Sequence, residues 1–123
     1  MSPATSIRPF IGTPDFTHSR AFYLQLGFEE LVIGEKMSLF KVTNSLSFYL
    51  QDYYVKDWVD NSMILLEVDY LTYWRQRISD SDVLTSFPSA RISGIQATDH
   101  GEVMYLHDPA GVLWHFYLFA QDS

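Results

Sequence analysis

Hydrophobic and polar positions in the first half of the chain follow the period of a strand and then that of a helix. Residues 7–12 are a short apolar run, and residues 13–15, Thr-Pro-Asp, are of the kind that begins a helix. Apolar side chains then recur every three or four positions until Gly27, which is placed as a left-handed helix cap. The predicted buried face of this helix consists of Phe16, Ser19, Phe22 or Tyr23, and Leu26. Three short strands are expected next, over residues 28–33, 37–42 and 46–51.

The second half repeats this order after a polar and aromatic connector at residues 52–62. Residues 63–68 predict a strand, and Asp69 stands where it can cap a helix. The buried face expected for that helix consists of Leu71, Trp74 and Ile78, and residues 79–91 predict a loop. Three more strands are expected over residues 92–97, 102–107 and 112–119, with turns at 98–101 and 108–111. The pattern therefore predicts an α+β fold of two βαβββ units, roughly 6–51 and 63–119, in one domain over residues 1–123.

Composition narrows the functional classes. The chain of 123 residues has no cysteine, which excludes disulfides, thiolate metal sites and cysteine nucleophiles. Fifteen acidic and eight basic residues give a net charge of −7, which repels phosphate backbones and argues against nucleic-acid binding. No apolar run approaches the length of a membrane span, and the first residues lack the pattern of a signal peptide. We therefore expect a cytoplasmic protein without nucleic-acid or membrane partners.

Four stretches of the duplicated unit together resemble a known superfamily. They are 8-RPFIGTPD-15, 15-DFTHSRAFYLQLGF-28, 57-DWVDNSMILLEV-68 and 101-GEVMYLHDPAGVLWHF-116. With the βαβββ repeat, they make nearly the whole chain similar to the vicinal oxygen chelate superfamily, and most to its bleomycin-resistance proteins. The most specific of these motifs is the Asp-Pro-x-Gly turn followed by an alternating strand. The resemblance implies the glyoxalase/bleomycin-resistance fold, in which the two units form a cupped mixed sheet around the site.

The resemblance also identifies where a metal would bind. Enzymes of this superfamily, such as glyoxalase I and extradiol dioxygenases, hold a divalent metal on the first and last strands of each unit. Those four positions correspond to Arg8, Ser47, Met63 and His115 in this chain. Only His115 is a plausible ligand, because a guanidinium has no lone pair to donate and methionine and serine are poor ligands for such ions. One imidazole does not make a metal site, so we expect no metal cofactor.

Strand alternation defines the inner face of the cup if His115 points into it, as the resemblance implies. The connector adds an indole and a carboxylate, and position 100 falls where bleomycin-resistance proteins carry a tryptophan in a Pro-Trp-Gly turn. The candidate ligand-binding residues are Phe10, Ser47, Tyr49, Gln51, Trp58, Asp60, Glu67, His100, His115 and Tyr117. They describe an aromatic trough with a few polar groups, which suits a flat organic ligand.

Several of these residues also have a purely structural interpretation. His115 could be a core histidine bonded to a backbone carbonyl, and Trp58 could simply cover the end of a sheet. Glu67 and His115 could act as base and acid, but only their shared parity suggests this, and no catalytic residue is assigned. His18 and His107 have no companion at ligand spacing and are interpreted as structural.

The leading hypothesis is a metal-independent protein that sequesters an aromatic ligand, one that can also carry positive charge, with bleomycin-type antibiotic resistance as the family example. The resemblance further implies a homodimer in which both chains form the walls of each cleft. The alternative is a metal-dependent lyase or dioxygenase of the glyoxalase type, and a third hypothesis is a regulatory or escorting binding module. A histidine at position 100 in place of a stacking indole argues against bleomycin itself as the ligand.

Overall fold

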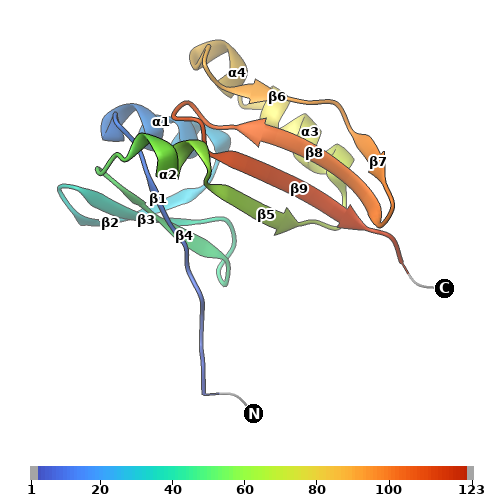
Figure 1. Ribbon diagram of the computed structural model, residues 1–123, viewed down its shortest axis with the longest axis horizontal. Helices are drawn as coiled ribbons and strands as arrows, with labels where there is room; N and C mark the ends of the chain where they lie inside the picture. The colour runs from blue at the N-terminus through green and yellow to red at the C-terminus, as the bar shows by residue number, and fades with distance from the viewer. Residues whose placement is uncertain (1–2, 122–123) are drawn as a thin grey trace.

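The computed structural model describes residues 3–121, and Figure 1 shows its helices and strands in chain order. The first unit contains β1 (Phe10–Gly12), α1 (Phe16–Leu26), β2 (Glu29–Gly34), β3 (Met37–Lys41) and β4 (Ser47–Gln51). A short helix, α2 (Lys56–Asp60), leads to the second unit. That unit contains β5 (Met63–Glu67), α3 (Leu71–Asp80), α4 (Val83–Ser86), β6 (Arg91–Ile92), β7 (Gln96–Thr98), β8 (Gly101–His107) and β9 (Leu113–Phe119). Within residues 3–121, no helix is long and apolar enough to cross a membrane.

Each unit forms its own mixed sheet. Sheet A has the strand order β1-β4-β3-β2, and sheet B has the order β5-β9-β8-β6, with β7 also paired to β8. In both sheets the first strand of the unit runs parallel to the last strand, and the remaining strand pairs are antiparallel. The α+β class and the duplicated order of elements predicted from the sequence are thus confirmed.

Helix α1 begins and ends where the sequence predicts. The side chain of Asp15 accepts a hydrogen bond from the backbone N–H of His18 at 3.0 Å, which satisfies one of the free donors at the start of the helix. Gly27 stops the helix in the left-handed conformation, with φ of 99°. The buried polar side chain on its inner face, Ser19, shares a 2.7 Å hydrogen bond with Thr13. The predicted buried face and both caps are therefore confirmed.

Replacing Gly27 by alanine should destabilise the fold by about 1–2 kcal/mol, because an L-residue is strained in the left-handed region. The added Cβ would also lie 2.9 Å from the Arg77 guanidinium. Gly34→Ala is the matched control, since its φ is not positive and its Cβ would meet no atom within 4 Å. Urea unfolding of the three proteins measures the difference, and equal midpoints for the two variants would contradict the cap.

Two segments predicted as irregular contain short helices. The connector 52–62 includes α2, in which Val59 is the one buried residue. The predicted loop 79–91 includes the last residues of α3 and then α4, which buries Val83. Those predictions were wrong because a helix with a single buried side chain leaves no periodic signal in the sequence.

Three local predictions in the strands and caps also need correction. Strand β1 begins at Phe10, three residues later than expected. The residue at the N-cap of α3 is Tyr70, with no side-chain cap hydrogen bond, so Asp69 does not cap this helix. The strand predicted over 92–97 is split into β6 and β7, because the Ser93 side chain takes the place of a backbone partner and accepts the N–H of Tyr105 at 2.9 Å.

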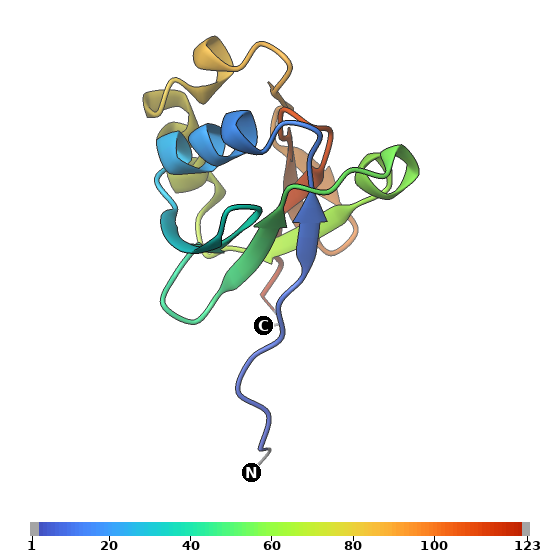
Figure 2. The same cartoon turned by 90° about the vertical axis from the view of Figure 1, so that its left-hand side faces the viewer.

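Aromatic rings dominate the core between the helices and the sheets. Figure 2 shows α1 and α3 together on one side of the two sheets. The ring of Trp114, on β9, lies 5.2 Å from that of Phe48, on β4, and 6.0 Å from that of Tyr23, on α1. All three side chains are buried. Because these contacts join a strand of the second unit to a strand and a helix of the first, the two sheets share one core.

The turn before β9 is fixed by a buried carboxylate. Asp108 Oδ1 accepts three backbone N–H groups, each at 2.9 Å, from Ala110, Gly111 and Val112. Its other oxygen, Oδ2, accepts the hydroxyl of Tyr23 at 2.6 Å, and that hydroxyl in turn accepts the indole N–H of Trp114 at 3.0 Å. Burial raises the pKa of the Asp108 carboxyl, and the hydrogen bonds to it oppose the rise. The Asp-Pro-x-Gly turn is therefore bonded directly to α1.

Candidate functional site

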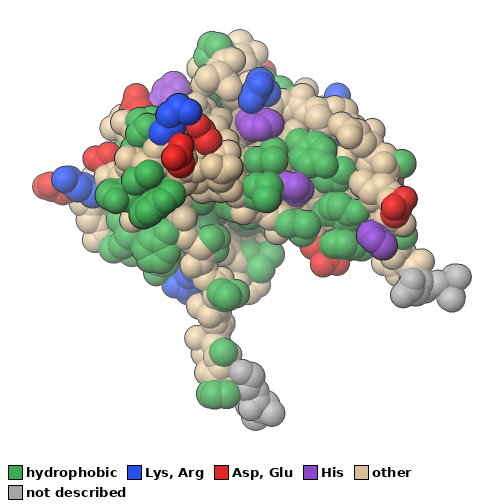
Figure 3. All heavy atoms as spheres, viewed as in Figure 1, with side chains coloured by type: hydrophobic (Ala, Val, Ile, Leu, Met, Phe, Trp, Pro, Cys, Tyr) green, Lys and Arg blue, Asp and Glu red, His purple; other side chains and the backbone are tan. Residues whose placement is uncertain are grey.

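The side of the sheets away from α1 and α3 carries exposed apolar side chains. In β9, Trp114 and Phe116 are buried in the core, whereas His115 lies on the opposite, half-buried face, as strand alternation predicts. Met63 and Leu65, on the neighbouring β5, are 67% and 52% exposed. Figure 3 shows hydrophobic side chains gathered over sheet B with histidines among them. We call this surface the open face of sheet B; its residues are Met63, Leu65, Glu67, Tyr105, His107, Leu113, His115 and Tyr117.

Sheet A has a smaller open face, which holds four of the predicted site residues. Phe10 pairs across the sheet with Tyr49, and their rings lie 4.8 Å apart. Ser47 and Gln51 flank Tyr49 on the same face of β4 and are half-buried. Arg8 donates a hydrogen bond to the Tyr49 hydroxyl at 3.2 Å. The structure therefore brings these side chains together, with a guanidinium at their edge.

Trp58 and Asp60, from the connector, lie on α2. Trp58 is 63% exposed, and its ring lies 5.9 Å from that of Tyr53. Both rings line a small pocket of about 50 Å³ together with Phe10 and Gln51, so the indole adjoins the open face of sheet A. Asp60 is instead engaged by Lys56 at 2.7 Å on the same helix. Its carboxylate is therefore neutralised locally, which weakens its predicted role toward a cationic ligand.

The His115 imidazole lies near the middle of sheet B. Its ring stands edge-on to Tyr105 with the centroids 5.0 Å apart, and Leu65 lies directly across from it on β5. Its Nε2 atom is shielded from solvent and has no hydrogen-bond partner among the described residues. The bond from this nitrogen to a backbone carbonyl, which a purely structural histidine would make, is thus missing. A buried polar atom without a partner is costly, and a bound ligand could satisfy it once a side chain that shields the atom has turned aside.

The remaining predicted residues lie toward the far end of sheet B. Glu67 pairs across the sheet with Tyr117 rather than with His115, and no hydrogen bond joins Glu67 to His115 within residues 3–121. The Tyr117 hydroxyl is 2.5 Å from that of Thr98. His100 is exposed in the turn between β7 and β8, and its carbonyl accepts the N–H of Ala120. This geometry does not support the acid–base pair of Glu67 and His115.

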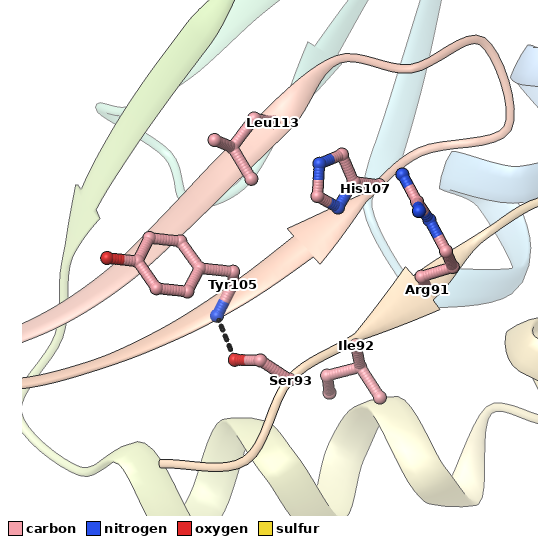
Figure 4. A pocket seen from close by; sticks show the side chains of 6 residues that line it. All are labelled: Arg91, Ile92, Ser93, Tyr105, His107 and Leu113. Atoms are coloured by element: carbon pink, nitrogen blue, oxygen red, sulfur yellow. Dashed lines mark hydrogen bonds between the residues drawn. The ribbon is translucent and has the colours of Figure 1, made fainter. Parts of the chain in front are cut away.

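A pocket of about 430 Å³ lies at the other end of the open face of sheet B. Its lining residues are Arg91, Ile92, Ser93, Tyr105, His107 and Leu113 (Figure 4). Sequence reasoning missed this pocket and treated His107 as structural. One signal was available, because Tyr105 and His107 alternate with the buried Met104 and Leu106 along β8.

Comparisons with known proteins agree with this architecture. No protein-family profile matches the chain, and no curated protein matches it in sequence. Among solved structures, the bleomycin-binding protein of Streptomyces verticillus, in complex with copper(II)-bleomycin, superposes with a TM-score of 0.80 at 16% identity, over 98% of this chain and 100% of that one. A second bleomycin-binding protein, complexed with bleomycin, superposes with a TM-score of 0.77 at 20% identity, over 97% of this chain and 100% of that one. The chain has the glyoxalase/bleomycin-resistance fold.

The same fold is found with a metal in another neighbour. The fosfomycin resistance protein FosX of Listeria monocytogenes, complexed with Mn(II) and sulfate, superposes with a TM-score of 0.68 at 14% identity, over 98% of this chain and 93% of that one. Similarity at this level of identity establishes the architecture alone. Whether a chain with the glyoxalase/bleomycin-resistance fold can hold a metal depends on its own donor atoms.

The donor atoms of this chain do not fit a divalent metal site. Within residues 3–121, no three His, Asp or Glu side chains lie together in a way that could hold an ion. Of the four positions that the resemblance assigns to the metal, Arg8 is a cation bonded to Tyr49, and Met63 lies beside Leu113 on the open face. His115 therefore has no companion ligand among those positions, and no chemical step through a metal follows from this arrangement.

Proposed function

We propose that this protein is a metal-independent binding protein that sequesters a flat aromatic small molecule on the open faces of its sheets. The observation that carries the proposal is the unpartnered Nε2 of His115 among aromatic and apolar side chains. A surface of this kind binds planar ligands by stacking and burial, and a few polar atoms orient them. Bleomycin-type antibiotics are the first candidates, because two structural neighbours bind bleomycin. A role in antibiotic resistance and a cytoplasmic location belong to the same proposal.

We further propose that the functional unit is a homodimer. Exposed apolar side chains on both open faces, such as Phe10 and Met63, favour burial against a second copy of the chain. The segment before β1 supports this as well, since it runs away from the body in Figures 1 and 2 and leaves Ile7 96% exposed. Closing two such faces on each other would convert an exposed trough into a cleft that buries a ligand on two sides.

Thermal shift in the presence of bleomycin and of other planar aromatic cations tests the binding function. A ligand at a hundredfold excess over its dissociation constant should add about 2.7 kcal/mol of stability. His115→Ala should weaken the affinity about tenfold, because the ligand loses one hydrogen bond, with a smaller effect on the free energy of unfolding. His18→Ala is the matched control, since this exposed histidine lies on α1, on the other side of the sheet.

Two results would overturn the proposal. A stoichiometric divalent ion in protein purified without chelators would favour the metal-dependent lyase or dioxygenase. If no ligand raises the melting temperature and His115→Ala lowers the free energy of unfolding, His115 has a structural role instead.

A further inference from the structure

An arginine and a histidine lie side by side at the β6 end of sheet B. Arg91 and His107 face each other directly across the antiparallel pair of β6 and β8. Figure 4 shows the guanidinium and the imidazole at one end of the pocket, with the rings of Tyr105 and His107 on the same side of the sheet as Leu113. The charge of Arg91 disfavours the protonated form of His107, so the two side chains do not attract each other across the strands. The pair is therefore not explained by the folding of the sheet.

Arg91 has no acceptor of its own. Across residues 3–121, it is the one arginine whose side chain makes neither a hydrogen bond nor an ion pair. Each of the others has a partner: Arg8 bonds Tyr49, Arg20 pairs with Glu30, Arg75 bonds the Ser93 carbonyl and Arg77 bonds the Leu26 carbonyl. A guanidinium presents five N–H donors in a fixed fork that matches a carboxylate. An unpaired arginine at the mouth of a pocket is thus a ready anchor for an anionic group.

His107 adds a second donor to this end of the pocket. Partial burial and the nearby Arg91 charge both lower the pKa of His107, so its imidazole is neutral at pH 7 and one nitrogen carries a hydrogen. An anion bound between the two side chains would accept from both. The bound anion would also offset the positive charge of Arg91, so the pKa of His107 would rise.

Within residues 3–121, no carboxylate forms an ion pair with Arg91. Asp60 comes near the β8–β9 turn, its Oδ1 lying 3.6 Å from the place of a Cβ on Gly111, but it is paired with Lys56. Asp108, the residue after His107, is buried and directed toward Tyr23 in the core. Arg91 is therefore the lining residue of the pocket that carries a permanent charge, and its guanidinium is free to pair with an anion.

The rest of the pocket wall is apolar and aromatic. Tyr105 and Leu113 supply a flat surface, and the Tyr105 ring leads to His115, whose Nε2 atom lacks a partner. A ligand with an anionic group at one end and a ring against Tyr105 would satisfy both ends of this surface. We propose that the pocket over β6, β8 and β9 binds the carboxylate of an aromatic small molecule between Arg91 and His107. This inference rests on the proposed binding function, and it replaces a cationic antibiotic with an anionic aromatic molecule as the ligand of this face.

A matched pair of ligands tests the inference. 2-Naphthoate and 2-naphthamide have the same ring system and differ in charge, and titration calorimetry gives both affinities. Wild-type protein should bind the carboxylate at least tenfold more tightly than the amide. Arg91→Met should lower the affinity for naphthoate by about 10- to 100-fold and leave that for naphthamide unchanged, because a hydrogen bond to a charged group is lost. Lys36→Met, which removes an equal charge from an exposed position, should leave both affinities unchanged.

The possible failures can be told apart. Equal affinities for the two ligands, or the same loss in Arg91→Met and Lys36→Met, would overturn the anion site while the aromatic trough stands. Binding of neither ligand would overturn the trough and the anion site together. A second readout is the pKa of His107, measured by following its imidazole NMR resonance against pH. This pKa should rise on adding naphthoate and stay constant with naphthamide. A constant pKa with naphthoate bound would place the carboxylate elsewhere.

Discussion

Asp108→Ala is expected to destabilise the protein by about 3–5 kcal/mol, because this buried carboxylate holds a turn against the core. The substitution removes the acceptor of three backbone N–H groups and of the Tyr23 hydroxyl at once. Those donors lie in or beside the core, where an unpaired donor costs about 1–3 kcal/mol. Because domains of this size are stable by about 5–15 kcal/mol, the loss is a large part of the total. Urea or thermal unfolding measures it.

Two further variants separate the carboxylate's role from a general effect on the turn. Asp108→Asn keeps one oxygen for the three N–H groups but offers N–H rather than an acceptor to Tyr23, so we expect a smaller loss of about 1–2 kcal/mol. Asp99→Ala, in the exposed turn between β7 and β8, should change the stability by less than about 0.5 kcal/mol. A loss under 1 kcal/mol for Asp108→Ala would mean that water replaces the carboxylate, and the bond between turn and α1 would then carry little energy.

This network explains why one motif of the sequence was more informative than the others. In the segment from Asp108 to Gly111, the aspartate, the proline and the glycine with φ of 110° are all required by a single turn that ends at Val112. Helix α1 was predictable for a similar reason, since its cap, its apolar period and its Gly27 stop agree within 13 residues (15–27). The local sequence was enough to predict an element where several local signals agree on it.

Elements that depend on distant contacts were not predictable. After β6 the chain leaves the regular strand pairing at Ser93, because the Ser93 side chain accepts the N–H of Tyr105 and its carbonyl accepts from Arg75, on α3, at 3.0 Å. Both partners are more than ten residues away, so the run from Ile92 to Ala97 reads locally as one strand. The prediction of an irregular connector over 52–62 was wrong for the same reason, since only the packing of Val59 distinguishes α2 from a loop.

The residues of the candidate site also fall into those that the local sequence predicts and those that depend on distant contacts. Alternation placed His115 and Tyr117 on the open face of sheet B, because neighbouring side chains of a strand must point to opposite sides. The pairing of Arg91 with His107 could not be foreseen, because it depends on the register of β6 against β8. The alternation along one strand predicts which side chains share a face, whereas the pairing register between two strands determines which charged side chains lie next to each other.

The second large effect is expected for Met63→Glu, which should convert the proposed homodimer into a monomer. Met63 is 67% exposed on β5, at the edge of sheet B, so a charged residue there costs the isolated chain little. Burying a methionine side chain contributes about 1.5–3 kcal/mol, and a two-fold dimer loses that contribution twice. The dimer should therefore weaken by about 10²- to 10⁴-fold, and sedimentation velocity over a dilution series measures the change.

Val32→Glu is the control for this substitution, because it separates the open face from general surface charge. Val32 is 58% exposed and lies in the edge strand β2 of sheet A, on the same side as Glu30, which pairs with Arg20 of α1. It is an exposed apolar residue like Met63 but faces the helices' side of the sheet, so this variant should remain dimeric. If both variants keep the oligomeric state of the wild type, the open face of sheet B is not the dimer interface. If Met63→Glu is monomeric yet still binds a planar ligand with unchanged affinity, one chain forms the whole binding surface, and the cleft needs no wall from a second copy.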